Sequence, residues 1–130
     1  MNQIMWDPKY EQMQSSQMIT FMNFVNNRFN MSMQNYHELY EWSIKKSEKF
    51  WECFWEYSNI IHYKSYYNVV DDIYQMPGAK WFKGATLNFA ENLLRYRDDK
   101  VAILFYDEDG NQISITCKEL FSKVSRLSNY

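Results

Sequence analysis

Carboxylates recur at helical spacing in the first half of the chain. Glu48, Glu52 and Glu56 stand one helical turn apart, so a helix would place them on one face. Carboxylate oxygens at that spacing suit a divalent cation, but no third ligand lies at a matching distance in the sequence. We therefore interpret these residues, together with Glu38 and Glu41, as the solvated faces of helices whose opposite faces are aromatic.

The side chains that serve as nucleophiles, bases or zinc ligands are scattered. Cys53 and Cys117 form no CxxC pair, and His37 and His62 have no local serine or cysteine partner. A tetrahedral zinc site has no ligand spacing to support it. We interpret the cysteines as reduced thiols that pack as small hydrophobic residues, and the histidines as ordinary surface or interface residues.

Two further segments resemble binding sites only in part. Asp107–Gly110 begins like a calcium-binding loop but lacks the later bidentate glutamate, so a hairpin turn explains it better. Lys80 and Lys83 flank Trp81 and Phe82, a pattern that could suit a nucleotide-phosphate or single-stranded nucleic acid site. The formal net charge of −2 and the lack of a wider basic stripe predict no nucleic acid partner.

The composition indicates a protein with a hydrophobic core and argues against a phosphate-binding enzyme. The 130 residues include nine Phe, eleven Tyr and five Trp, which is 19% of the chain, but only three Gly and two Pro. The aromatic content excludes disordered and low-complexity classes. A phosphate-binding loop is glycine-rich, and this chain has few glycines. The N-terminus lacks a secretory pattern and Met13–Asn27 is interrupted by polar residues, so we predict a cytoplasmic protein with no membrane contact.

Helices are predicted for most of the first 58 residues. Apolar residues at helical spacing predict a helix from Ser15 or Ser16 to Arg28, and another from Asn35 as its N-cap. Ser47 is predicted to cap a third helix, in which Trp51 and Trp55 share one face. Core packing explains these tryptophans better than an exposed binding platform.

The middle of the chain is less regular. Ile60-Ile61 and Tyr66–Val70 are short strands or loop with buried anchors, and Pro77-Gly78 is a strong break. An irregular aromatic segment, Ala79–Ala85, is followed by a short helix over Phe89–Arg95. Asn88 is expected to cap this helix, and Phe89, Leu93 and Leu94 are expected to point inward.

A charged linker at Arg97–Lys100 precedes a change of pattern. The apolar run Val101–Tyr106 predicts a buried strand, and Asp109-Gly110 predicts a hairpin with Ile113–Ile115. Thr116 and Glu119 fit a capping box that opens a helix. Because a lone hairpin with one helix is marginally stable, we expect residues 97–130 to open a larger domain and the chain to be a fragment.

The segment Pro77–Leu94 resembles the N-terminal region of the acetyl-CoA-synthetase type of acyl-CoA synthetases, within the adenylate-forming ligases. The matching structural positions are Pro77, Gly78, Trp81, Phe82, Gly84, Leu87, Asn88, Ala90, Glu91, Asn92 and Leu93. The resemblance is strongest to acetoacetyl-CoA synthetases, and it extends to Trp6-x-Pro8 and to the aromatic helices. Residues 101–130 are similar to the first strand pair and helix of the family's large domain, with Cys117 where the family often has an aromatic residue.

This resemblance implies a fold and an activity. The fold class is α+β: a mostly helical, aromatic-rich N-terminal region over residues 1–95, then a truncated start of the α/β adenylation (AMP-binding) domain over 96–130. The parent reaction would be ATP-dependent activation of acetoacetate or another short acid to its CoA thioester, in lipid metabolism, with ATP, Mg²⁺ and CoA.

The family's phosphate loop and catalytic lysine have no counterpart in this sequence. No catalytic, cofactor-binding or metal-binding residue is therefore assigned, and the chain is predicted to be structural and inactive, with the adenylation domain of the same chain as its partner. A stand-alone aromatic-rich interaction module and a non-functional product of gene decay are the alternatives.

Overall fold

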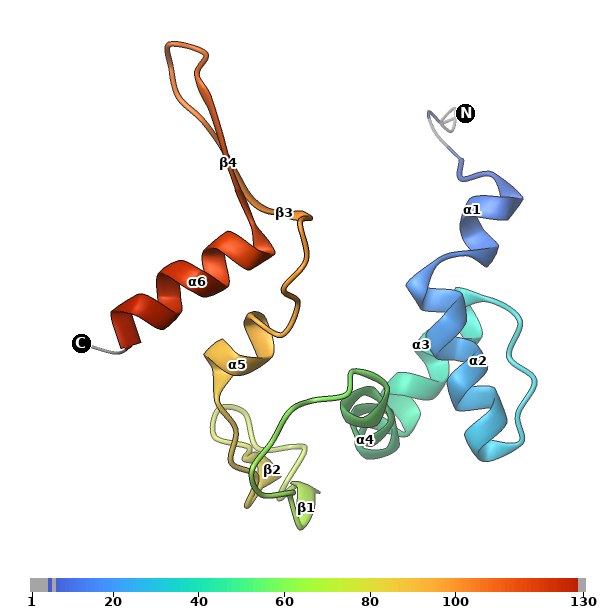
Figure 1. Cartoon of the computed structure of the whole chain (residues 1–130). Helices are drawn as coiled ribbons and strands as arrows, with labels where there is room; N and C mark the ends of the chain where they lie inside the picture. The colour runs from blue at the N-terminus through green and yellow to red at the C-terminus, as the bar shows by residue number, and fades with distance from the viewer. Residues whose placement is uncertain (1–4, 6, 129–130) are drawn as a thin grey trace. The chain divides into compact units, whose positions relative to one another are not determined.

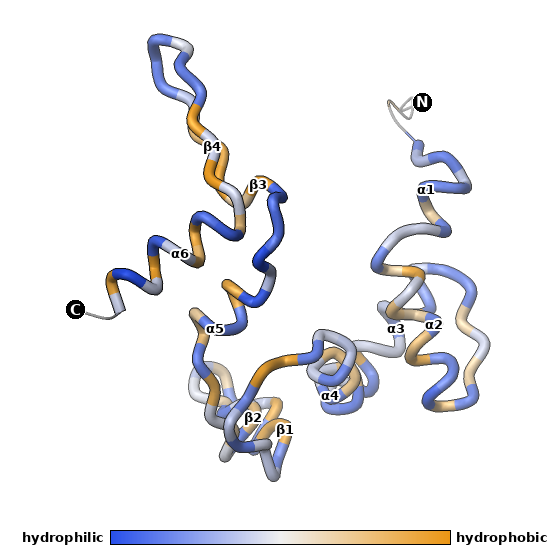
Figure 2. Tube along the Cα trace, in the orientation of Figure 1, coloured by the Kyte–Doolittle hydropathy of each residue, from blue (hydrophilic) through white to orange (hydrophobic). Residues whose placement is uncertain are grey.

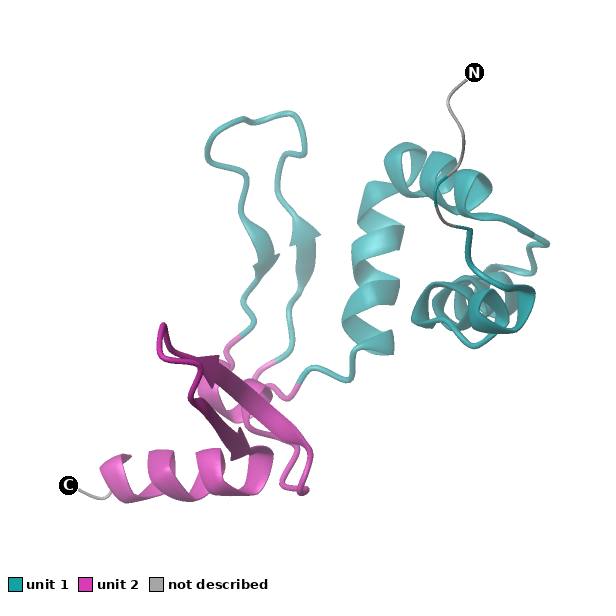
Figure 3. Ribbon diagram, turned by 90° about the horizontal axis from the view of Figure 1, so that it is seen from above, with its two compact units in different colours: residues 1–60, 65–85 teal, residues 61–64, 86–130 magenta. Residues whose placement is uncertain are grey.

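The computed structural model describes residue 5 and residues 7–128 and divides the chain into two compact units. Unit 1 lies within residues 1–60 and 65–85, and unit 2 within residues 61–64 and 86–130 (Figure 3). Trp6, which contributes to the family resemblance, lies outside the described residues. The predicted division into family domains at residues 95 and 96 stays a prediction.

Unit 1 is a group of helices followed by a two-stranded ribbon (Figure 1). Its elements are α1 (Tyr10–Gln14), α2 (Gln17–Phe29), α3 (Tyr36–Lys45), α4 (Ser47–Tyr57), β1 (Asn68–Val70) and β2 (Trp81–Lys83). Three of these helices match the predicted ones. The five-residue helix α1 was not predicted, because it is too short to show a helical period.

Side-chain caps fix where the helices begin. The Ser16 hydroxyl accepts a hydrogen bond from the Ile19 amide at 3.3 Å, and the Asn35 side chain accepts one from the Glu38 amide at 3.1 Å. The prediction that Ser47 caps α4 was wrong. Ser47 is the first helical residue, and its hydroxyl donates to the Ile44 carbonyl of the preceding helix at 3.0 Å instead.

The core of unit 1 lies where α2, α3 and α4 meet. Its buried residues are Phe21, Met22, Val25, Met33, Leu39 and Cys53. The Phe21 ring packs edge-on against Phe50, Phe54 and Tyr57 of α4, at centroid distances of 5.1–5.8 Å. These edge-to-face contacts are the favoured geometry for aromatic pairs. The aromatic residues of α4 thus pack against this core: Phe50 and Tyr57 are half-buried, whereas Trp51 and Phe54 are 39% and 43% exposed, so the predicted core packing holds in part.

The ribbon of unit 1 is antiparallel, with Asn68 opposite Lys83 and Val70 opposite Trp81. The predicted irregular segment Ala79–Ala85 therefore contains a strand, whereas Ile60-Ile61 lies in no strand. Three-residue strands are too short for an alternating pattern to reveal them.

Unit 2 contains α5 (Phe89–Leu93), the hairpin of β3 (Val101–Tyr106) and β4 (Gln112–Thr116), and α6 (Cys117–Ser128). The predicted capping box is confirmed: the Thr116 amide donates to the Glu119 carboxylate at 2.9 Å, and the Glu119 amide donates to the Thr116 hydroxyl at 3.2 Å. The predicted α+β character of the chain is confirmed as well.

The prediction that Val101–Tyr106 is a buried strand was wrong about burial. All six residues of β3 are exposed, and Figure 2 shows the apolar character of the hairpin where its strands pair. Helix α6 packs against both strands, and of the strand residues only Ile115 and Thr116, at the end of β4, are half-buried. The sequence pattern identifies an apolar strand. Whether that strand is buried depends on which other elements pack against it.

Candidate functional site

The strongest candidate site is the family motif, residues 77–93, whose two halves fall in different units. In unit 1, Trp81 packs against Trp51 of α4 with ring centroids 5.7 Å apart. Phe82 contacts Trp55 of α4 at 4.6 Å and Tyr66 at 5.3 Å. The predicted shared face of Trp51 and Trp55 is therefore the surface that receives the motif.

The backbone at Phe82 explains how two neighbouring residues reach the same helix. Successive side chains of a regular strand point to opposite faces. Phe82 has a φ of 48°, in the left-handed region that a bulky residue rarely adopts. The strained backbone is held by the contacts of its ring with Trp55 and Tyr66. Both motif aromatics thus serve to attach β2 to α4.

Glycine is required directly after this strand. Gly84 has a φ of 92°, and a β-carbon there would lie 2.5 Å from the Tyr67 ring. Gly84 is therefore required both for its left-handed backbone and for its lack of a side chain. Gly78, with a φ of 118°, follows the cis Met76–Pro77 peptide bond in the loop between β1 and β2. Both glycines therefore adopt the positive φ of a turn.

The loop between β1 and β2 is closed by one carboxylate. Asp71 accepts hydrogen bonds from the backbone amides of Lys80 and Asp72, each at 2.8 Å. The Lys80 bond is the main reason why the pKa of Asp71 lies below its ordinary value. Lys80 contributes its backbone to this closure, while its side chain is exposed beside Trp81.

In unit 2, the second half of the motif fastens the chain through two asparagines. Asn88 caps α5 by accepting from the Glu91 amide at 3.2 Å, as predicted. Asn92 accepts from the Ile61 amide at 2.9 Å and donates to the Ile61 carbonyl at 2.8 Å. Glu91 accepts a hydrogen bond from the Tyr63 hydroxyl at 2.9 Å. The motif therefore holds residues 61–63 against α5 through bonds that span 28 to 31 positions.

The apolar residues of this second half are placed differently from the prediction. Phe89 is 75% exposed and Leu93 is 66% exposed, so neither points inward; Leu94 is half-buried. Leu87 and Ala90 are exposed as well. A five-residue helix covers little surface, and its hydrogen-bonding side chains, rather than its apolar ones, face the rest of unit 2.

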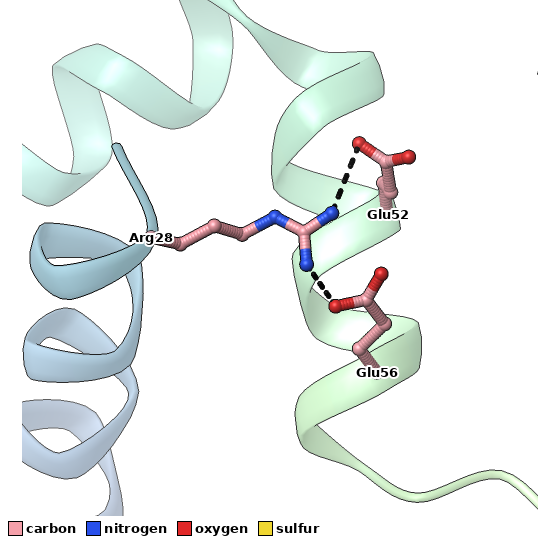
Figure 4. Close-up of polar contacts among 3 residues, drawn as sticks. All are labelled: Arg28, Glu52 and Glu56. Carbon is pink, nitrogen blue, oxygen red and sulfur yellow. Dashed lines mark hydrogen bonds and ion pairs between the residues drawn. The ribbon is translucent and has the colours of Figure 1, made fainter. Parts of the chain in front are cut away.

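The glutamates at helical spacing contact an arginine. Figure 4 shows Arg28 of α2 reaching α4, where its Nη1 pairs with Glu56 and its Nη2 lies 3.8 Å from Glu52. Burial alone would lower the pKa of Arg28. The hydrogen bond to Glu56 and the negative charge of Glu56 outweigh burial, so the pKa of Arg28 is raised. The solvated-face interpretation missed this pair, since Arg28 lies 24 and 28 positions from its partners.

The described residues include both cysteines and both histidines, the candidate nucleophiles, bases and metal ligands of the sequence. Among them, no three His, Cys, Asp or Glu side chains gather in a way that would hold a metal ion. Burial raises the pKa of the Cys53 thiol, which makes the nucleophilic thiolate scarce. His37 lies in unit 1 and His62 in unit 2. In the part of the chain that the structure describes, no helix has the length and apolar character needed to cross a membrane.

Comparison with known proteins connects this motif to a family. Residues 36–93 match the family model described as acetyl-coenzyme A synthetase N-terminus. The chain is 37% identical to malonamoyl-CoA synthetase vrtB of Penicillium aethiopicum, over 98% of this chain and 18% of that protein. It is 35% identical to acetoacetyl-CoA synthetase of Gallus gallus, over 95% of this chain and 19% of that protein.

A solved structure agrees with these matches. The acetoacetyl-CoA synthetase from Streptomyces lividans superposes with a TM-score of 0.81 at 31% sequence identity, covering 95% of this chain and 20% of that one. The chain thus spans about a fifth of the length of its relatives. Over nearly its whole length, it is similar to the N-terminal region of the acetyl-CoA-synthetase type of acyl-CoA synthetases, the acetoacetyl-CoA synthetases included.

Proposed function

We propose that this chain acts as the N-terminal region of an acyl-CoA ligase similar to acetoacetyl-CoA synthetase, and that its role there is structural. The observation that carries this proposal is the structural role of the motif residues. Trp81, Phe82, Gly84, Asn88 and Asn92 all hold the chain's own backbone in place, through ring contacts, a tight turn and hydrogen bonds.

The parent reaction would join a short carboxylic acid to CoA at the expense of ATP. The acid and ATP form an acyl-adenylate and release pyrophosphate, after which CoA displaces AMP. We propose that ATP, CoA and Mg²⁺ bind elsewhere in the ligase. Gly78, Gly84 and Gly110 lie in three separate turns, and a phosphate cradle needs several small residues together.

The adenylation domain of the same ligase is the proposed partner, and the cytoplasm and lipid metabolism are the proposed setting. Within this proposal, residues 1–95 form the N-terminal region and residues 96–130 the first elements of the adenylation domain. The capping box that begins α6 supports this assignment, since the resemblance to the large domain includes Thr116, Glu119 and Leu120.

Two assays test the proposal. The purified chain, given ATP, Mg²⁺, CoA and acetoacetate, is expected to release no pyrophosphate above a protein-free blank. A chimera, in which this chain replaces the matching fifth of the Streptomyces lividans enzyme, is expected to be soluble and to form acetoacetyl-CoA. Acid-dependent pyrophosphate release by the chain alone, or an inactive chimera, would contradict the proposed role.

A stand-alone interaction module is the second candidate function, and one observation favours it. An apolar groove of about 350 Å³ in unit 1 runs between α2, α3 and α4, and its lining includes Met18, Tyr36, Tyr40 and Phe54, all partly exposed. A chain that purifies as a stable monomer and retains its full secondary structure would favour this candidate. Self-association through uncovered apolar surface would favour the ligase.

A further inference from the structure

The β3–β4 hairpin carries apolar side chains on both of its faces. The register pairs Ile103 with Ile115 and Phe105 with Ile113, so these four isoleucine and phenylalanine side chains share one face, here called face A. The alternate residues Leu104 and Tyr106, opposite Ser114 and Gln112, form face B. Phe105 is 52% exposed and Leu104 is 48% exposed, and of the residues on the two faces only Ile115 on face A is half-buried, so both faces are largely uncovered.

Strand β3 is unusual for a surface that meets water, whereas β4 alternates Ile113 and Ile115 with the polar residues Gln112 and Ser114. An antiparallel sheet with one wet face alternates apolar and polar residues, whereas strands covered on both sides are apolar throughout. In β3, from Val101 to Tyr106, no residue is charged. The strand therefore has the composition of an internal strand with a layer on each face.

The ends of the hairpin set the limits of the uncovered region. At the tip, the Asp107 carboxylate accepts from the backbone and the side-chain amide of Asn111, each at 2.7 Å, and Glu108 and Asp109 follow in the turn. At the other end, β3 is preceded by the charged residues Asp98, Asp99 and Lys100. The apolar band between these ends is six residues long, or roughly 20 Å.

We infer that both hairpin faces are docking surfaces for the remaining part of an acyl-CoA ligase, which covers the hairpin with one layer on each side. This inference rests on the proposed function. The similar enzymes have about four fifths of their length beyond the region that this chain matches, which is ample to supply two layers. Face B is the stronger indication, since a partner on face A alone would leave Leu104 and Tyr106 in water.

The chimera with the Streptomyces lividans enzyme tests this inference through one variant on each face. Phe105→Asp on face A and Leu104→Asp on face B each place a charge in a buried layer, so each is expected to lower the yield of soluble, active chimera by roughly tenfold or more. Glu108→Gln at the hairpin tip is the control and is expected to leave yield and activity unchanged. In the isolated chain, far-UV circular dichroism is expected to show that all three variants keep the parent's secondary structure.

The outcomes separate this inference from the proposed function. If the parent chimera is active and either Asp variant matches it in yield and activity, that face meets water and the two-layer inference is overturned, while the proposed function stands. If the parent chimera is inactive, the proposed function fails, and the rest of a ligase is not what covers the hairpin. In that event, light scattering that shows self-association of the isolated chain, abolished by Phe105→Asp, would assign the hairpin to a second copy.

Discussion

Single residues of the motif are constrained by backbone geometry more than by chemistry. Gly84 is the clearest case, because its φ of 92° and the Tyr67 ring both exclude a side chain. Gly110 in the hairpin turn has a similar φ of 82°, but a β-carbon there would meet nothing within 4 Å. The two glycines therefore separate the cost of backbone strain from the cost of a steric clash.

Gly84→Ala is expected to lower the free energy of unfolding by roughly 2–4 kcal/mol, since it combines strain with overlap against Tyr67. Gly110→Ala is expected to cost only about 1 kcal/mol. Urea denaturation followed by circular dichroism measures both. Adding Tyr67→Ala to Gly84→Ala should recover part of the loss. Equal costs for the two glycine variants would refute the role given to the Tyr67 ring.

Asn92 acts through hydrogen bonds to the backbone. Asn92→Ala removes the acceptor of the Ile61 amide, so the exchange of that amide with solvent is expected to accelerate by roughly tenfold. Hydrogen exchange followed by NMR measures the rate at Ile61. Asn23→Ala, at an exposed position of α2, is the matched control and should leave Ile61 unchanged. Unaltered protection in Asn92→Ala would show that the clamp is not formed.

At the scale of elements, the start of α6 depends on the ionisation of one carboxylate. The Thr116 backbone amide, and secondarily its hydroxyl, hold the pKa of Glu119 below its ordinary value. A lowered pKa in the folded state stabilises the helix above the unfolded-state pKa, near 4.3. That stabilisation is lost as the pH falls through the folded-state pKa.

Glu119→Gln keeps an acceptor for the Thr116 amide but removes the charge that titrates. We expect the Thr116 amide resonance of the parent chain to shift with pH at a midpoint below 4.3, and this shift to vanish in Glu119→Gln. An NMR titration from neutral to acidic pH measures both. A midpoint at or above 4.3 would argue against the capping box.

The contact between α2 and α4 combines a core with a surface ion pair, and the core is expected to dominate. Arg28→Met should lower the free energy of unfolding by less than about 1 kcal/mol, because the pair with Glu56 is partly exposed. Leu39→Ala, in the buried core of the same unit, should cost roughly 2–5 kcal/mol. Denaturant unfolding compares them, and a reversed order would make the ion pair the main link.

At the scale of the whole molecule, the features that the sequence predicts correctly are those formed by residues close together in the chain. The caps at Asn35, Asn88 and Thr116 were predicted, and the start of α2 was predicted at Ser15 or Ser16, because each cap acts on an amide three residues away. The hairpin was also predicted, from its turn residues and apolar runs. These features depend on neighbours in the sequence and need no knowledge of the rest of the fold.

Contacts between distant residues were not predicted from the sequence. The Asn92 clamp on Ile61 and the Arg28 pair with Glu56 join residues 31 and 28 positions apart, and nothing in their local sequence points to the partner. The burial of β3 was wrongly predicted for a related reason: an apolar strand shows that a cover is needed, but not that the cover lies within these residues. The same mismatch supports a role inside a larger ligase.

The central claim is that this chain serves as the packing region of an acyl-CoA ligase and contributes no catalytic group. The most direct test is acetoacetyl-CoA formation by the chimera, compared with the Streptomyces lividans enzyme truncated by its matching fifth. We predict that the truncated enzyme is insoluble or inactive and that this chain restores activity. A chimera no more active than the truncated enzyme would contradict the claim.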